Sequence, residues 1–311
     1  MKSVLMKGQT TYFKLMNDID MSSIDNWQPL NPDDPYDLGV DFNGDGHSLK
    51  NLKSKDVKYA SFFGVLYGNC HDVKFEGAEI VGNTKSGAGI IGGYIGTGSK
   101  PAHVYNVEAS GTVTNKATGQ NLGGLGGNAR EATIENCSVN VTVTNPMGDG
   151  TKEGRTATGG VIGKTLEKVS ITGCTSKGTV ETTAGTSNTY TGGIVGYVAT
   201  AQTDISNCQS HASVKSAGER VGGIVGHYEG GTLSGCKFYG ELNAATKYAG
   251  GIAGITSKES TITNCLSDGK VNCATLTGGI VGMNESTLTL EACESSSTIA
   301  GTDRAGGIIG R

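Results

Sequence analysis

The chain has 311 residues, of which 51 are glycine, 5 are proline and 6% are aromatic, a composition typical neither of a collagen nor of a common enzyme. Its 25 basic and 29 acidic residues give a net charge of -4 without any lysine or arginine block, which disfavours nucleic acid and anionic membrane surfaces as partners. Every apolar run is much shorter than the roughly 20 residues that cross a bilayer, so membrane insertion is not expected.

The N-terminal segment, residues 1–56, is predicted to form a cap with the first strands of the fold. Its opening MKSVLMKGQTTYFKL lacks the apolar core and the small-residue cleavage site of a signal peptide. Oxygen-rich loops can bind calcium, but no EF-hand or nonapeptide calcium pattern is present, so we interpret the aspartates as turn formers and predict no metal and no cofactor. These aspartates are Asp18, Asp20, Asp25, Asp33, Asp34, Asp37, Asp41 and Asp45.

The remainder, residues 57–311, repeats one five-letter block. GGIVG at 192–196 returns in the same or a similar form, and the second glycine of each block lies 28 to 36 residues after the one before it. A period of this length predicts a solenoid, since propeller blades need four antiparallel strands in about 40 to 45 residues. The reference positions are Gly124, Gly160, Gly193, Gly223, Gly251, Gly279 and Gly307, with weaker blocks around Ser61 and Gly89.

A second frame, T-[IL]-x-[NG]-C, follows each block, as in TIENC at 133–137 and TITNC at 261–265. An aliphatic residue always stands six positions after the cysteine, at Val143, Val180, Val214, Leu242, Val271 and Ile299. We read three short β segments per period, each alternating apolar and polar residues. The prediction is an all-β, right-handed parallel β-helix of about nine coils, continuous with the N-terminal cap in a single domain.

The glycine pair has a structural interpretation. Glycine adopts positive φ without a Cβ penalty and lets neighbouring backbones approach closely, so we expect the pair to turn the same corner in every coil. A phosphate-binding glycine loop would occur once, ahead of a helix, and with a lysine or acidic partner. The many copies make that alternative improbable.

The blocks GGIVG…TLSGC…GELNA…YAGGIAG resemble the GLUG-motif repeats of bacterial surface proteins. The segment YFKLMNDIDMSS, followed by DFNGDGHSLKNL at 41–52, is similar to the segment that commonly precedes such repeats. The resemblance covers nearly the whole chain and implies the β-helix fold. It also implies a place in adhesin-like proteins or in larger secreted proteins, including some peptidases, and it brings no catalytic residues.

Six of the eight cysteines occupy one repeat position, where Val73 and Val107 stand in earlier coils. We therefore expect a stacked interior column of free thiols that act as small apolar groups. Cys70 aligns with the Ile/Leu position three residues before the column, and Cys273 is out of register. Residues 28 to 37 positions apart in a column do not converge as zinc ligands do. The column is Cys137, Cys174, Cys208, Cys236, Cys265 and Cys293.

Catalytic residues are not predicted. Glu135 and Glu291 share a repeat position but lie five coils apart, and the five histidines, at 47, 71, 103, 211 and 227, share no register. Glycoside hydrolysis and polysaccharide lysis need carboxylates, or a carboxylate with a base, gathered on one face. An enzyme remains the alternative hypothesis, as a carbohydrate-active lyase or hydrolase with its site on the face of the inserted loops.

Insertions lengthen one corner in the N-terminal half. The distance from the column cysteine to the next reference glycine falls from 23 residues after Cys137 to 14 after Cys293. The inserted segments are 115–122, 145–158 and 184–191. Because solenoid insertions often mark the binding face, we predict binding through this corner and through tyrosines that follow the glycine block. The residues are Lys152, Glu153, Arg155, Tyr190, Tyr197 and Tyr228.

These observations predict an extracellular or cell-surface binding and adhesion module without catalysis. The expected partner is a surface protein or a glycan, of host or microbial origin. A passive spacer within a larger surface protein is the other alternative. The segment is expected to belong to a longer chain, because an open last coil after GGIIGR would expose strand edges.

Overall fold

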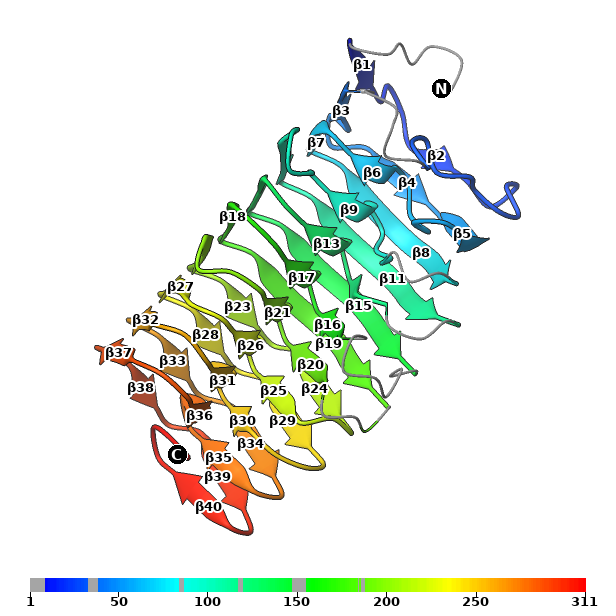
Figure 1. Cartoon of the computed structure of the whole chain (residues 1–311). Coiled ribbons are helices and arrows are strands. Elements are labelled where there is room, and N and C mark those ends of the chain that lie inside the picture. The colour runs from blue at the N-terminus through cyan, green and yellow to red at the C-terminus, as the bar shows by residue number, and fades with distance from the viewer. Residues whose placement is uncertain are drawn as a thin grey trace.

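The chain forms a parallel β-solenoid of about nine turns in the computed structural model, which describes residues 9–32, 39–83, 87–116, 120–146, 155–183, 185 and 188–311. The coils stack from the N-terminal to the C-terminal end of an elongated body (Figure 1). Within these ranges no residue is helical, and so no helix has the length and hydrophobicity to cross a membrane. The predicted all-β solenoid is confirmed.

A complete coil contributes strands to four sheets, whereas the described residues of the first coils contribute no named strand to the 7-stranded sheet, whose first strand is β12 (Leu122–Gly123). One complete coil contains β13 (Gly126–Ala129), β14 (Ala132–Glu135), β15 (Ser138–Asn145) and β16 (Thr156–Gly159), which lie in sheets of 8, 10, 15 and 7 strands. The prediction of three segments per coil is therefore wrong. The additional strand, β16 and its equivalents, ends on the first glycine of the glycine pair and has only two to four residues.

The N-terminal segment continues the same ladders. Strand β1 (Thr10–Lys14) pairs in parallel with β3 (Gly39–Asn43), and β2 (Ile19–Asp20) pairs in parallel with β4 (Ser48–Lys50). Aromatic rings fill the interior here: Phe62 stacks on Trp27 at 5.1 Å between ring centroids and contacts Phe63 at 4.8 Å. The Trp27 indole also donates a 2.8 Å hydrogen bond to the Phe62 carbonyl. The first coils are thus joined by one aromatic cluster.

The apolar columns of the core follow the repeat. Val143 pairs with Val180, which pairs with Val214, and the column continues through Leu242, Val271 and Ile299. Side chains in register on parallel strands stack at the strand spacing of about 4.8 Å. The offset of six residues between the column cysteine and this aliphatic residue therefore reflects two parallel interior columns.

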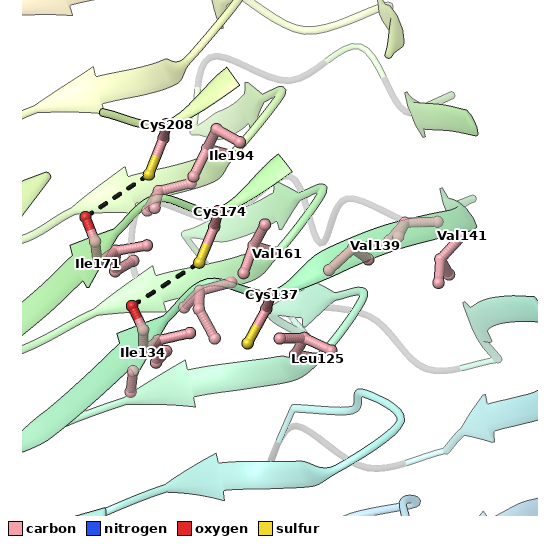
Figure 2. Packing of buried hydrophobic residues seen from close by; sticks show 14 of the residues in the cluster. Leu125, Ile134, Cys137, Val139, Val141, Val161, Ile171, Cys174, Ile194 and Cys208 are labelled. Atoms are coloured by element: carbon pink, nitrogen blue, oxygen red, sulfur yellow. Dashed lines mark hydrogen bonds between the residues drawn. The ribbon is translucent and has the colours of Figure 1, made fainter. Parts of the chain in front are cut away.

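The cysteine column lies at the corner between the 10-stranded and the 15-stranded sheets. Cys174 and Cys208 are fully buried, and Figure 2 shows their thiols directed at the carbonyls of Ile134 and Ile171, at 3.7 and 3.6 Å. All eight cysteines are free in the structure. Cys70 pairs with Phe42 and Val104 in the neighbouring interior column, where burial raises the pKa of its thiol. In the cysteine column itself the thiols from Cys137 to Cys265 are buried and pack as small apolar groups, whereas Cys293 in the last coil is half-buried.

The residue before each column cysteine adopts the left-handed conformation. Asn136, Asn207 and Asn264 have φ values of 52, 52 and 53°, while Gly173 and Gly235 occupy the same place in other coils. Asparagine and glycine tolerate this region better than other residues. The [NG] position of the sequence frame is therefore the conformational corner of the coil, and the last such corner carries Ala292 at φ 50°.

Replacement of Ala292 by glycine should stabilise the protein by about 1 kcal/mol, because alanine is strained in the left-handed region. Asn264→Ala, the converse change one coil earlier, should cost a similar amount. Urea unfolding followed by circular dichroism measures both. Equal stability of Ala292→Gly and the unchanged protein would contradict the assignment of strain to this corner.

The glycine pair turns its corner through close backbone approach and not through positive φ. None of the glycines at 192, 193, 222 and 223 has a left-handed φ, so that part of the prediction is wrong. A Cβ on Gly193 would lie 2.0 Å from the Gly223 carbonyl oxygen and 2.2 Å from the Ser210 hydroxyl oxygen. Successive coils are therefore in contact through these glycines.

Candidate functional site

The corner that the insertions lengthen lies immediately before β16 (Thr156–Gly159) and β20 (Thr189–Gly192), the strands that end at the glycine pair. Lys152 and Glu153 lie outside the described residues. Arg155 is described, stands immediately before β16, and has a side chain 48% exposed. It is therefore the one predicted binding residue that the structure places at the surface of this corner.

Two tyrosines meet where the glycine pair folds the chain back. Tyr190 in β20 (Thr189–Gly192) and Tyr197 in β21 (Val195–Val198) have ring centroids 4.7 Å apart. His227 in β26 (Val225–Tyr228) stacks on Tyr197 at 5.2 Å. Both tyrosines are 2% exposed. Their rings therefore form the floor of the corner and do not offer a face for stacking on a sugar.

Tyr228 does not belong to this group. Tyr197 pairs with His227, whereas Tyr228 pairs with Val198. GGIVGHY contains one more residue between glycine and tyrosine than GGIVGY, and a one-residue offset in a strand places a side chain on the opposite face. Tyr228 is fully buried in the main core, so the prediction of Tyr228 as a binding residue at the surface is wrong.

A charged relay lies over the tyrosines. The Arg155 guanidinium donates a hydrogen bond to the Tyr197 hydroxyl, which in turn donates to Glu229 Oε1. Arg155 Nη1 lies 3.4 Å from the same carboxylate oxygen, and Lys258 Nζ lies 2.9 Å from Oε2. The Glu229 side chain is only 13% exposed. One nearly buried carboxylate thus links three different coils.

Further cations face the same rings. Lys164 Nζ lies 5.2 Å from the Tyr197 centroid, and Arg220 Cζ lies 5.3 Å from the Tyr190 centroid. Such placements are favourable cation–π contacts. We call the whole group the basic corner. Its members are Arg155, Lys164, Tyr190, Tyr197, Arg220, His227, Glu229 and Lys258.

Burial dominates the electrostatics of the basic corner. It lowers the pKa of Lys164, and the charge of Arg155 lowers that pKa further. Burial and the hydrogen bond to Glu229 raise the pKa of the Tyr197 hydroxyl, which therefore stays neutral. Burial alone would raise the pKa of Glu229, but the bonds from Tyr197 and Lys258 outweigh it and hold that pKa below its usual value. Among the residues that the structure describes at this site, four cations accompany one carboxylate, that of Glu229.

His227 gives the basic corner a pH dependence. Burial, followed by the charge of Arg220, lowers the pKa of His227 to about 3. The unfolded chain binds this proton below about pH 6.5 while the folded chain does not, so stability falls as the pH drops through that window. Between pH 7 and pH 5 the loss should be about 2 kcal/mol.

Replacement of His227 by glutamine should remove that part of the acid sensitivity. Urea unfolding at pH 7 and pH 5 gives the change in unfolding free energy for each variant. His211→Gln, at an exposed histidine, is the control and should keep the slope of the unchanged protein. An unaltered slope in His227→Gln would show that another group carries the effect.

A second polar cluster, which the sequence reasoning missed, lies on the outer face of the 10-stranded sheet. His71 Nδ1 is 2.7 Å from Asp72 Oδ2, and its Nε2 is 3.1 Å from Asp41 Oδ1. The His71 ring stacks on Tyr105 at 4.6 Å, and Tyr105 also contacts His103. His71 and His103 do not occupy the same repeat position, because His71 pairs with Tyr105 and not with His103. They come together diagonally across neighbouring strands, which a search for aligned positions does not detect.

The N-terminal aspartates that the structure describes make one local turn contact and two ion pairs between neighbouring coils. Asp20 Oδ1 accepts a hydrogen bond from the Ser22 amide at 2.9 Å, Asp18 forms a 2.9 Å ion pair with Lys50, and Asp45 forms one with Lys14. Asp33, Asp34 and Asp37 lie outside the described residues. Across the described part of the chain, no group of three or more His, Cys, Asp or Glu side chains is placed to hold a metal ion.

Parts of the chain are similar in sequence to a known repeat family and to a relative of much greater length. The family model described as the GLUG motif matches residues 118–144 and 187–215. Halomucin from Haloquadratum walsbyi is 28% identical over 166 residues, which is 50% of this chain but only 2% of halomucin.

Solved structures share the fold. A crystal structure from Bacteroides ovatus, described as a candidate immunoglobulin A1 protease, matches with a TM-score of 0.64 and 28% identity, covering 94% of this chain and 80% of that one. A structure described as IgA1 protease matches with a TM-score of 0.54 and 17% identity, covering 81% of this chain and 20% of that one, and its likeness concerns the fold alone. The chain thus carries GLUG motifs, and its solenoid fold is the one expected of GLUG-repeat β-helix proteins.

Proposed function

We propose that this chain is a binding module of an extracellular or cell-surface protein and that it contacts its partner through the basic corner. The observation that carries the proposal is a set of partly exposed cations fixed over two buried tyrosines, beside the corner that the insertions lengthen. The similarity to halomucin and to the Bacteroides ovatus structure supports a place outside the cell. A partner from host or microbial surfaces, protein or glycan, fits such a module.

Rigidity supports the proposal. Tyr197 is held by Arg155 and Glu229, and Glu229 is held in turn by Lys258. Side chains that are fixed before binding lose less conformational entropy when a ligand arrives. The basic corner is therefore preorganised.

The test is a glycan array and a panel of surface proteins probed with the whole chain, combined with assays for reducing-sugar release and for protein cleavage. We expect binding without turnover, weakened at least tenfold by Arg155→Gln. Lys237→Gln, which removes a positive charge from an exposed residue in the 15-stranded sheet, should bind normally. Absence of binding to every probe would favour the passive spacer instead.

The second candidate is a hydrolase, and one observation favours it: His71 is held between Asp41 and Asp72. A histidine oriented by one carboxylate can act as a general base through its other ring nitrogen, so a substrate would have to take the place of Asp41 or Asp72 at the His71 ring. The assignment of the Bacteroides ovatus structure as a candidate protease agrees with this alternative. Turnover that is lost in His71→Gln and kept in His211→Gln would establish it and would overturn the non-catalytic proposal.

A further inference from the structure

The basic corner holds more positive charge than its own carboxylates neutralise. Glu229 is shared by Arg155 and Lys258, and Glu219, the next carboxylate, is paired with Lys247. Lys164 forms no ion pair with any residue that the structure describes, and its contact is the face of Tyr197. This local excess occurs in a chain whose net charge is -4. A half-buried lysine without a counter-ion favours an anion that comes from outside.

The cations follow the long axis of the solenoid. Arg155 and Lys164 belong to one coil, Arg220 begins β25 (Arg220–Gly222) two coils later, and Lys258 follows β31 (Ala253–Thr256) one coil beyond that. Three steps of about 4.8 Å separate the backbones at the ends of this track by roughly 14 Å, but the side chains of Arg155 and Lys258 converge on the two oxygens of Glu229. The charged groups of the track are therefore close together, and Lys164 and Arg220 lie against the adjoining tyrosine rings, an arrangement that suits the closely spaced anionic groups of a chain-like ligand.

The backbone of the track argues against an acidic peptide. Strands β17 (Ile162–Thr165), β21 and β26 are paired on both sides within their sheet. A peptide that binds by strand addition needs an unpaired sheet edge. The surface over these strands therefore offers a ligand only side chains, and charged side chains recognise charged groups.

Resting on the proposed function, we infer that the basic corner binds an acidic polysaccharide, with its carboxylate or sulfate groups seated between Arg155 and Lys164. The two cations flank one ring, since Arg155 Cζ and Lys164 Nζ lie 5.5 and 5.2 Å from the Tyr197 centroid. The anion neutralises Lys164, whose charge is otherwise opposed by burial and by Arg155. A guanidinium presents paired donors that suit both carboxylate and sulfate oxygens.

The experiment measures binding of the whole chain to polygalacturonate, dextran sulfate, neutral dextran and poly-glutamate at low and moderate salt. We expect one or both polysaccharide anions to bind, neutral dextran and poly-glutamate to bind at least tenfold more weakly, and affinity to fall as salt rises. The comparison of polygalacturonate with dextran sulfate identifies the preferred anionic group.

Variants link the affinity to the basic corner. Arg155→Gln combined with Lys164→Gln should lower affinity at least tenfold, and Lys164→Arg should preserve it. Lys237→Gln combined with Lys270→Gln, at two exposed lysines of the 15-stranded sheet, is the charge-matched control. Circular dichroism establishes that each variant is folded. Binding of a neutral glycan with no preference for anions would overturn this inference and leave the proposed function intact, whereas equal binding of poly-glutamate would overturn the choice of a polysaccharide. Failure to bind any probe on the panel or on the array would remove both.

Discussion

Substitution of Gly223 by alanine is expected to destabilise the protein by about 3 kcal/mol, at the upper end of the range for overpacked interiors. A Cβ at this position would lie 2.1 Å from the Gly251 carbonyl oxygen and 2.4 Å from a ring carbon of Phe238. The first atom belongs to the backbone of the next coil, and the second to a fully buried ring. Neither can move without separating the coils.

Gly307 provides the matched control, because it occupies the same place in the last repeat and a Cβ there would meet no atom within 4 Å. Gly307→Ala should change the unfolding free energy by less than about 0.5 kcal/mol. Urea unfolding by circular dichroism compares the two variants. Similar unfolding free energies for the two variants would contradict the contact between coils as the reason for glycine at this position.

Truncation of Phe62 to alanine is expected to cost about 3–5 kcal/mol, as for other large aromatic residues in cores. Its ring contacts four other rings, among them Phe42 at 5.4 Å and Phe75 at 5.7 Å. These contacts join residues from successive coils at the N-terminal end. The loss should therefore concentrate in the first coils, since solenoid stability is approximately a sum over neighbouring repeats.

Trp27, the single tryptophan of the chain, reports on this region directly. In Phe62→Ala, its fluorescence transition in urea should occur at a lower concentration than the transition seen by circular dichroism. Phe62→Leu retains an apolar side chain and should show a smaller loss. If both transitions of Phe62→Ala moved together, the N-terminal coils would not unfold separately from the others.

The interior of this fold is predictable from the sequence because the period fixes it. Residues at the same repeat position, such as Cys174 and Cys208, must stack once the strands are parallel and in register. The left-handed corner can also be predicted from the sequence, since asparagine and glycine recur before the column cysteine. These features depend only on backbone geometry and on position within the repeat.

The basic corner is less predictable because it breaks the repeat. Its charged relay joins Arg155 to Glu229, residues 74 positions apart that share no place in the period. Long side chains reach across coils, so their contacts depend on rotamers as well as on register. Tyr228 illustrates the same point, since one added residue before it changes the face on which it lies. Burial of Tyr190 and Tyr197 follows from the tight fold-back at the glycine pair, which the sequence pattern indicates only as a corner.

The direction of the hydrogen bonds between coils has a mechanical consequence. Every ladder between the named strands is parallel and joins one coil to the next, so its hydrogen bonds lie along the axis of the rod. Tension applied between the two ends would break the hydrogen bonds between neighbouring coils one coil at a time. A released coil of 28 residues extends to roughly 95 Å, while its folded form occupied about 4.8 Å. Such a rod under load lengthens in steps and limits the force that reaches whatever is attached to it.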